Sequence, residues 1–294
     1  MRVLASARSH GRPWSSRPAT GGGRPAGLAM AVLLAACSGP AAPPEAPAPA
    51  VPELRWHERN VERSEGDCDT SGGRCCTVNY RFPEIDEAPG EALRRELEGT
   101  IDAMILGGDD GERMGETPEA AADAFVEAFR DVLQEAPQVP GGWADERVVE
   151  IVHLDPTWVS LRFSHYEFTG GAHPNTFVQL RTLRLSDGVA PSLDDLLVPG
   201  GRSRLDGVAE GRFREVRGLS ADEDLEAAGF TFFEGDRFAL NDNFAVVDDG
   251  LLFHYNPYEI APYVMGPTEL FLSWQDLAGI VRPDVHPDVG VDAS

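Results

Sequence analysis

Apolar and polar residues alternate along much of the chain, a period of two that predicts β-strands. In the clearest run, Cys76, Val78, Tyr80 and Phe82 share one face. Later runs are rich in β-branched and aromatic residues, and Asp248-Asp-Gly250 between two apolar runs is typical of a hairpin turn. The predicted strands cover residues 54–61, 76–82, 148–154, 157–168, 176–185, 244–247, 251–255 and 271–274.

Three other stretches repeat apolar residues every three or four positions, which predicts helices over 93–105, 118–133 and 205–216. Thr117 followed by Pro118 is a typical N-cap and first-turn pair. Separate helices interrupt the strand-rich runs without a strand–helix–strand rhythm. We therefore predict an α+β fold, with antiparallel sheets and a few packing helices in two small subdomains.

The N-terminus has the organisation of an export signal. Five Arg and no acidic residue precede a short apolar run, Leu28–Ala36, and Leu34-Ala35-Ala36-Cys37 resembles the bacterial lipobox. We predict a lipoprotein signal peptide over 1–36 and lipid attachment at Cys37. The alternative is an ordinary secretory signal cut near Ala36, with Cys37 left as a thiol.

The predicted location is the cell envelope, with the folded part lipid-anchored and extracytoplasmic. Ser38, instead of Asp, follows Cys37, which favours the outer membrane if the source is Gram-negative. Residues 37–52 are rich in Pro and Ala and predict a semi-rigid linker without a core-forming face.

Acidic residues dominate the mature part. All 25 basic residues of the chain are Arg, and the 20 that follow Cys37 face 49 Asp and Glu, a net charge of −29. Such a charge repels nucleic acid and attracts a basic partner, and it also serves solubility.

Three cysteines remain after Cys37, and outside the cytoplasm a disulfide is expected. Cys68 lies in a Gly-rich loop that can fold back over Cys75 or Cys76. Alternation turns Cys76 towards the core and Cys75 outwards, which favours a Cys68–Cys75 bond and a buried Cys76 thiol. The Cys68–Cys76 pairing stays open.

No nucleophile elbow, P-loop or dinucleotide-binding glycine pattern occurs. We predict no cofactor and no catalytic residues. His165 and Glu167 share a strand face, and His173 follows in a Gly-rich loop, so these three are the candidate metal ligands. The alternative is that they are ordinary surface side chains.

Two segments are dense in aromatic, Gly and Pro residues, Tyr166–Pro174 and Tyr255–Tyr263. Such segments either form structural corners or provide a binding surface. The candidate binding surface consists of Tyr166, Gly170, Gly171, His173, Tyr258, Glu259 and Tyr263.

Four segments in order, 168–173, 185–188, 192–197 and 253–263, resemble the extracellular domain of the lysozyme-responsive anti-sigma factor RsiV. The resemblance covers residues 145–282. Residues 53–140 are more loosely similar to the N-terminal partner domain of PdaC-type peptidoglycan deacetylases. The resemblance implies an α+β fold and, for RsiV-like proteins, lysozyme binding. Because we expect a lipid anchor here in place of a spanning helix, sigma-factor control is not expected.

The predicted organisation is therefore a signal peptide over 1–36, a linker over 37–52, domains over 53–140 and 145–282, and a loose tail over 283–294. The predicted function is an envelope-anchored, non-enzymatic module that binds a protein, such as a basic lysozyme-like protein, or a cell-wall ligand. The membrane is a partner through the lipid, and nucleic acid is not. The alternative is a metal-dependent hydrolase or deacetylase that acts on peptidoglycan.

Overall fold

The computed structural model describes residues 53–68, 73–107, 112–136, 141–232, 237–286 and 289. The predicted signal peptide, Cys37 and the linker lie outside these residues. Within the described ranges, no helix has both the length and the apolar character needed to cross a bilayer.

Over the described residues, two sheets and three α-helices make up the fold, which confirms the predicted α+β class. The strands are β1 (Arg55–Gly66), β2 (Cys75–Glu87), β3 (Trp143–Leu154), β4 (Trp158–Phe168), β5 (Asn175–Arg184), β6 (Phe244–Val247), β7 (Gly250–Tyr255) and β8 (Thr268–Ser273). The helices are α1 (Glu91–Leu106), α2 (Pro118–Glu135) and α3 (Arg202–Arg217), with short 3-10 helices η1 (Asp194–Leu196) and η2 (Tyr263–Met265).

The five-stranded sheet has the order β1-β2-β3-β4-β5, and the second sheet has the order β6-β7-β8. All neighbouring strands are antiparallel except β2 and β3, which are parallel. The predicted antiparallel sheets therefore include one parallel pair, which makes the five-stranded sheet mixed. The reason is the connection: α1 and α2 both lie between β2 and β3 in sequence, and this long crossover returns the chain in the same direction.

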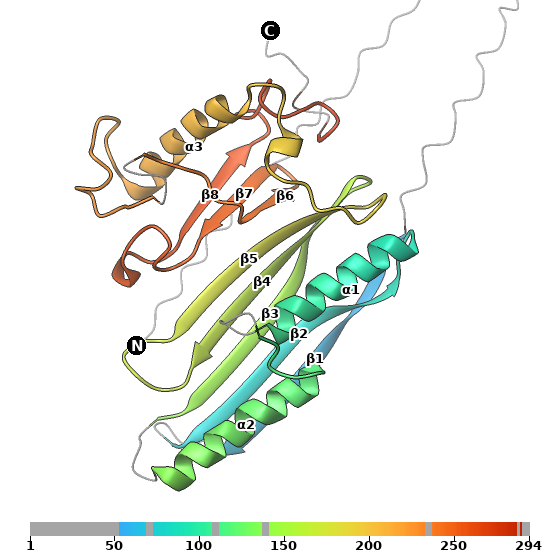
Figure 1. Cartoon of the computed structure of the whole chain (residues 1–294), viewed down its shortest axis with the longest axis vertical. Coiled ribbons are helices and arrows are strands. Elements are labelled where there is room, and N and C mark those ends of the chain that lie inside the picture. The colour runs from blue at the N-terminus through green and yellow to red at the C-terminus, as the bar shows by residue number, and fades with distance from the viewer. Residues whose placement is uncertain are drawn as a thin grey trace, which may run out of the picture. The chain divides into compact units, whose positions relative to one another are not determined.

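Helices α1 and α2 cover one face of the five-stranded sheet (Figure 1). The predicted alternation in β2 holds, since Cys76, Val78, Tyr80 and Phe82 are all buried. Thr117 caps α2 as expected, because its side chain accepts a hydrogen bond from the Ala120 amide at 3.1 Å. Satisfying this free amide fixes where the helix begins.

Helix α3 packs against the second sheet and contributes Phe213 to its core (Figure 1). The Phe213 ring contacts Phe230, Phe232 and Phe238, with centroid distances of 4.9, 5.6 and 5.4 Å. Gly218 then ends α3 in the left-handed region, with φ of 68°, where a glycine is unstrained.

The first core does not end near residue 140, where we predicted a domain boundary. Strand β3 pairs with β2 from Cys76 opposite Trp143 onward, so β3, β4 and β5 complete the sheet that β1 and β2 begin. The same core extends to Leu185. The backbone hydrogen bonds of β2 require a second neighbour, and residues beyond 140 supply it.

The predicted loose tail also needs correction in its described part. Val285 is only 4% exposed, and its carbonyl accepts a hydrogen bond from Trp158 Nε1 at 3.1 Å. Val289 is buried as well. Apolar side chains that fill the second core hold this segment against it.

The structure contains the favoured disulfide, Cys68–Cys75. Cys76 is a free and fully buried thiol, as the alternation in β2 predicted. Burial, together with the nearby negative charge of Asp145, raises the pKa of Cys76 to about 11. A thiol with this pKa is a packing group, because little reactive thiolate forms at neutral pH.

His153 links the two sheets. It lies on β3 and is 6% exposed, and its Nδ1 is 2.6 Å from Asp248 Oδ1 in the β6–β7 turn. Its Nε2 lies 3.3 Å from Asp155 Oδ2. Burial alone lowers the pKa of His153, but the two carboxylates outweigh it and raise this pKa above 6.5.

This arrangement predicts that stability falls as pH rises above 6.5. The protonated form of His153 stabilises the fold below pH 6.5, and this contribution is lost as pH rises through the higher folded pKa. The free energy of unfolding of the full chain should therefore fall over that range, as measured by urea unfolding at several pH values. A His153→Gln variant should show a flatter profile, and equal slopes for both proteins would contradict the prediction.

Candidate functional site

The two aromatic segments meet in space. The rings of His173 and Tyr263 stack with centroids 3.8 Å apart, and the Tyr263 hydroxyl donates to the Pro174 carbonyl at 3.0 Å. Tyr258 Oη lies 3.3 Å from His173 Nε2, although these residues are 85 positions apart. His173 Nδ1 lies 2.9 Å from the Pro174 carbonyl oxygen, and because a carbonyl can only accept a hydrogen bond, Nδ1 carries the proton. In the neutral ring Nε2 is then an acceptor, and the Tyr258 hydroxyl donates to it.

Two asparagines hold the second segment against the edge of the first sheet. β5 is the edge strand, and Asn256 pairs with both backbone groups of Val178, accepting from its amide at 2.7 Å and donating to its carbonyl at 3.0 Å. Asn243 accepts from the Leu180 amide at 2.7 Å. These side chains satisfy edge groups that would otherwise pair with another strand, and they place Tyr258 beside β5.

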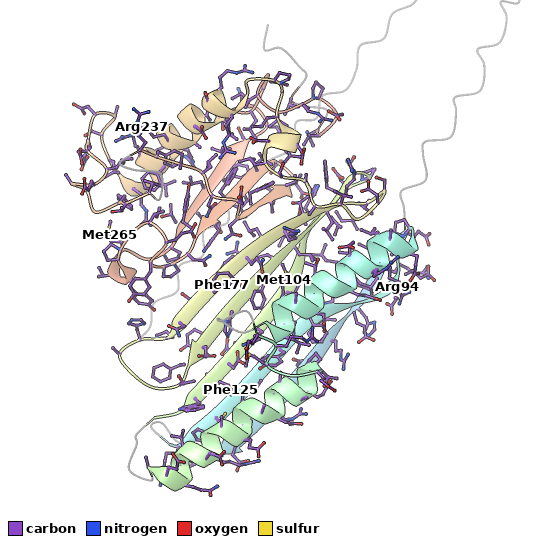
Figure 2. All side chains as sticks on the ribbon, viewed as in Figure 1. Arg94, Met104, Phe125, Phe177, Arg237 and Met265 are labelled. Carbon is purple, nitrogen blue, oxygen red and sulfur yellow. A yellow bond between two sulfur atoms is a disulfide. The ribbon has the colours of Figure 1, made fainter. Side chains whose placement is uncertain are left out.

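A cleft of about 500 Å³ opens between α1, the helix-facing side of β4 and β5, and the Tyr258 segment. Figure 2 labels Met104 on α1 and Phe177 on β5, which both line it. The lining residues are Ala103, Met104, Gly107, Phe163, His165, Asn175, Thr176, Phe177, Gln179, Pro257, Tyr258 and Tyr263. These described residues are aromatic, amide, hydroxyl or apolar in character, and none of them is Asp, Glu or Arg.

A buried polar network supports His165, whose ring reaches the cleft. His165 Nε2 lies 3.0 Å from Asp145 Oδ1, and the Tyr80 hydroxyl donates to Asp145 Oδ2 at 2.6 Å. Arg147 Nε donates to Asp145 Oδ1 at 3.1 Å. Asp145 is fully buried and Arg147 is 1% exposed, so the pair is isolated from water.

The charge state of Asp145 follows from these contacts. Burial alone raises the pKa of Asp145, but the hydrogen bond with His165 and the positive charge of Arg147 outweigh it, and the pKa lies below its ordinary value. Asp145 is therefore a carboxylate at neutral pH. It accepts the Nε2–H of His165, which leaves Nδ1 as the ring nitrogen available to a ligand in the cleft.

The structure separates some of the predicted surface residues. Tyr166 is 38% exposed but follows His165 on β4, so its side chain points to the opposite face of the sheet. Glu259 holds the loop, accepting from Asn241 Nδ2 at 2.6 Å and from the Asn256 amide at 2.8 Å. Tyr166 and Glu259 therefore lie outside the cleft lining.

Gly170 and Gly171 form the turn before His173. Both have positive φ, 100° and 107°, and open space surrounds the position of an added side chain at each. Their role is conformational, because this backbone region is strained for other residues. They bring His173 back towards Tyr263.

The three candidate metal ligands do not form a group. His165 is held by Asp145, and His173 is stacked on Tyr263. In the part of the chain that the structure describes, no three His, Cys, Asp or Glu side chains are arranged to hold a metal ion.

Sequence reasoning missed Asp145 and Arg147. A signal was present, since Asp145, Arg147 and Val149 alternate on one side of β3. Opposite charges on an apolar strand face indicate a buried pair, because an isolated buried charge is unstable.

Comparison with protein families gives two matches. The model described as "Deacetylase PdaC" matches residues 71–176, and the model described as "Protein of unknown function (DUF3298)" matches residues 194–275. The chain carries a PdaC-like domain followed by a DUF3298 domain. The PdaC-like match passes residue 140, in agreement with the extent of the first sheet.

Solved structures show the same fold. A DUF3298-family protein from Bacteroides fragilis is 19% identical, with a TM-score of 0.60 over 82% of this chain and 98% of that chain. A DUF3298-family protein from Pseudomonas aeruginosa is 21% identical, with a TM-score of 0.54 over 79% of this chain and 96% of that chain. None of the curated proteins matches the sequence.

The cleft lies where the two domains meet. The PdaC-like domain supplies Met104, Phe163 and His165, and the DUF3298 domain supplies Tyr258 and Tyr263. A ligand in the cleft would therefore contact both domains.

Proposed function

We propose that the chain is an envelope-anchored, non-enzymatic binding module, held by lipid at Cys37, with its ligand in the aromatic cleft. The observation that carries this proposal is the meeting of Tyr258 and Tyr263 with His173 beside an open cleft. Tyr258 is 65% exposed, and a large aromatic ring at a preformed concave site is typical of a binding surface.

The chemistry of the described lining supports binding over catalysis. Aromatic faces and side-chain amides recognise a ligand through contact and hydrogen bonds. Among the described lining residues there is no carboxylate or cysteine, groups that commonly activate water or attack a carbonyl.

Two ligand classes fit an envelope location. The resemblance to the partner domain of PdaC-type peptidoglycan deacetylases favours a cell-wall ligand. The net charge of −29 after Cys37 would favour a basic protein, such as a lysozyme-like protein.

Binding to purified peptidoglycan and to lysozyme tests the proposal, with the full chain in detergent. We expect binding in at least one assay, and the Tyr258→Ala variant should weaken it by about tenfold or more. Tyr166→Ala is the matched control, because it removes the same side chain from the opposite sheet face. In cells, Cys37→Ala should release the chain from membranes.

Two results would contradict the proposal. One is the absence of binding to both probes by the unaltered chain. The other is an equal loss of binding in Tyr166→Ala and Tyr258→Ala, which would exclude the cleft as the site.

A further inference from the structure

We propose that His153 and Asp248 form a pH-dependent latch between the two sheets, closed when the imidazole is protonated and released when it is neutral. This inference goes beyond the proposed function, because the latch needs no ligand. Three observations carry it: two separate apolar cores, a polar junction between them, and an imidazole placed between two carboxylates.

Each sheet has an apolar core of its own. Helices α1 and α2 and the five-stranded sheet enclose one cluster of buried side chains, and α3 and the three-stranded sheet enclose the other. Trp158 at the start of β4 is the residue of that strand that joins the second cluster. Because the two cores are separate, the junction between the sheets can loosen while most apolar burial is kept.

Hydrogen bonds cross the junction at several points. The Val246 amide on β6 donates to Thr182 Oγ1 on β5 at 2.9 Å. Asn243 Oδ1 accepts from a β5 amide at 2.7 Å, and Arg162 on β4 donates to Glu269 on β8 at 2.8 Å. Polar contacts of this kind can separate and be hydrated, so the strength of the junction depends on each of them.

His153 faces one carboxylate on each ring nitrogen. Its Nδ1 lies 2.6 Å from Asp248 in the β6–β7 turn, and its Nε2 lies 3.3 Å from Asp155 in the β3–β4 turn. A carboxylate only accepts hydrogen bonds, and only the imidazolium carries a proton on both nitrogens. The protonated ring therefore suits both carboxylates, whereas a neutral ring turns one lone pair towards a negative charge.

Asp248 is the carboxylate that can move away. Asp155 is held in place, because its Oδ1 accepts from the backbone amides two and three positions further along the chain, at 2.7 and 2.6 Å. The Asp248 side chain is 82% exposed, so water hydrates it once it leaves the ring. Its backbone stays with the second sheet, since its carbonyl accepts from Trp274 Nε1 at 2.9 Å. Loss of the His153 proton therefore releases a contact between the sheets.

Two carboxylates determine the charge of His153. Burial by itself lowers the pKa of the imidazole, but Asp155 and Asp248 outweigh burial and raise this pKa above 6.5. Its neighbour on β4 is the uncharged Ser160. The latch is therefore closed below pH 6.5 and opens as the pH rises through the higher folded pKa.

The other imidazoles near the junction are placed differently. His254 on β7 lies 3.5 Å from Glu269 on the neighbouring strand β8, and Arg162 binds the same carboxylate. His286 stacks on Trp274, with centroids 4.6 Å apart. Because the carboxylate beside His254 belongs to the same sheet, loss of the His254 proton removes no contact between the sheets. His254→Gln is therefore a control for a buried imidazole close to the latch.

Amide hydrogen exchange of the full chain in detergent tests the latch, because three amides report on the junction directly. The Val178, Leu180 and Val246 amides donate to side chains across it. We expect their protection factors, corrected for the intrinsic pH dependence of exchange, to fall by about fivefold or more between about pH 6 and pH 9. The amides that pair β2 with β3 lie in the first core and should keep their protection.

Two variants remove the latch. His153→Gln and Asp248→Asn each place a neutral amide where the charge was, and an amide both donates and accepts, so protection at the three reporter amides should become nearly independent of pH. Asp248→Asn alters an exposed side chain, and it decides the matter if His153→Gln does not fold. His254→Gln and a change of the exposed His57 to Gln should leave the pH dependence as it is.

Three results would overturn the inference. One is equal protection of the reporter amides at both pH values in the unaltered chain. Another is an equal loss at the β2–β3 amides, which would indicate unfolding of the whole chain. The third is a full pH-dependent loss in His153→Gln or in Asp248→Asn. None of these measurements involves a ligand, so their outcome is independent of binding to peptidoglycan or lysozyme.

Discussion

Replacing Arg147 by methionine should lower the free energy of unfolding by about 3–5 kcal/mol, the range for breaking one side of a buried ion pair. Arg147 is 1% exposed, and its partner Asp145 is fully buried. Methionine has a similar length, so the main loss is charge and hydrogen bonding, with a smaller change in volume. Urea unfolding of the full chain measures the effect.

Two sets of contacts make this loss large. Without the guanidinium, the Asp145 carboxylate remains buried without its cation. Arg147 Nη1 also donates to the carbonyls of Ile105 and Gly107, at 2.9 and 2.8 Å, where α1 ends. These carbonyls have no partner within the helix, so the substitution removes their cap as well.

A surface arginine provides the control. Arg63 on β1 pairs with Asp123, whose side chain is 63% exposed, and Arg63→Met should have a much smaller effect. If Arg147→Met does not fold, the double variant Arg147→Met with Asp145→Leu tests the explanation. It removes both buried charges, so it should recover stability relative to the single variant. A double variant no more stable than Arg147→Met, or a single-variant loss as small as that of Arg63→Met, would contradict the explanation.

Replacing Phe213 by alanine should cost about 3–5 kcal/mol, the usual range for removing a buried aromatic side chain. Phe213 is fully buried, and three phenylalanine rings surround it. Part of the loss is the favourable free energy of moving the ring out of water, which alanine no longer provides. The other part is the cavity left between neighbouring rings, which cannot close around it fully. Thermal or urea unfolding of the full chain measures it.

Phe271 is the matched control in the same domain. It lies on β8 and is 37% exposed, so Phe271→Ala should destabilise far less. Phe213→Leu should fall between the two, because it keeps part of the apolar volume. A Phe213→Ala loss no larger than that of Phe271→Ala would show that this cluster does not support the second core.

Local sequence patterns anticipated most helices and strands. Thr117 caps α2, Cys76 is buried, and Cys68 bonds Cys75, all as predicted. These features depend on residues close in sequence, where period and capping chemistry act directly. The parallel pairing of β2 with β3 was missed, since it depends on how a long connection returns the chain.

The candidate site was anticipated only in part. Sequence reasoning grouped Tyr166 with His173 because both lie in one short segment. On a strand, however, neighbouring side chains point to opposite faces, so Tyr166 and His165 diverge. Phe163, Phe177 and Gln179 were not identified, because on their own they are ordinary strand residues.

The sequence alone determined the fold class, the positions of the helices, the burial of Cys76 and the two aromatic segments around His173 and Tyr258. Each depends on local periodicity or on residue type. Only the tertiary structure brings these segments together, places Asp145 behind His165 and opens a cleft beside them. The physical reason is that Tyr258 and His173 lie 85 positions apart in the sequence. Their contact depends on how the edge strand β5 is paired and covered, which no local pattern encodes.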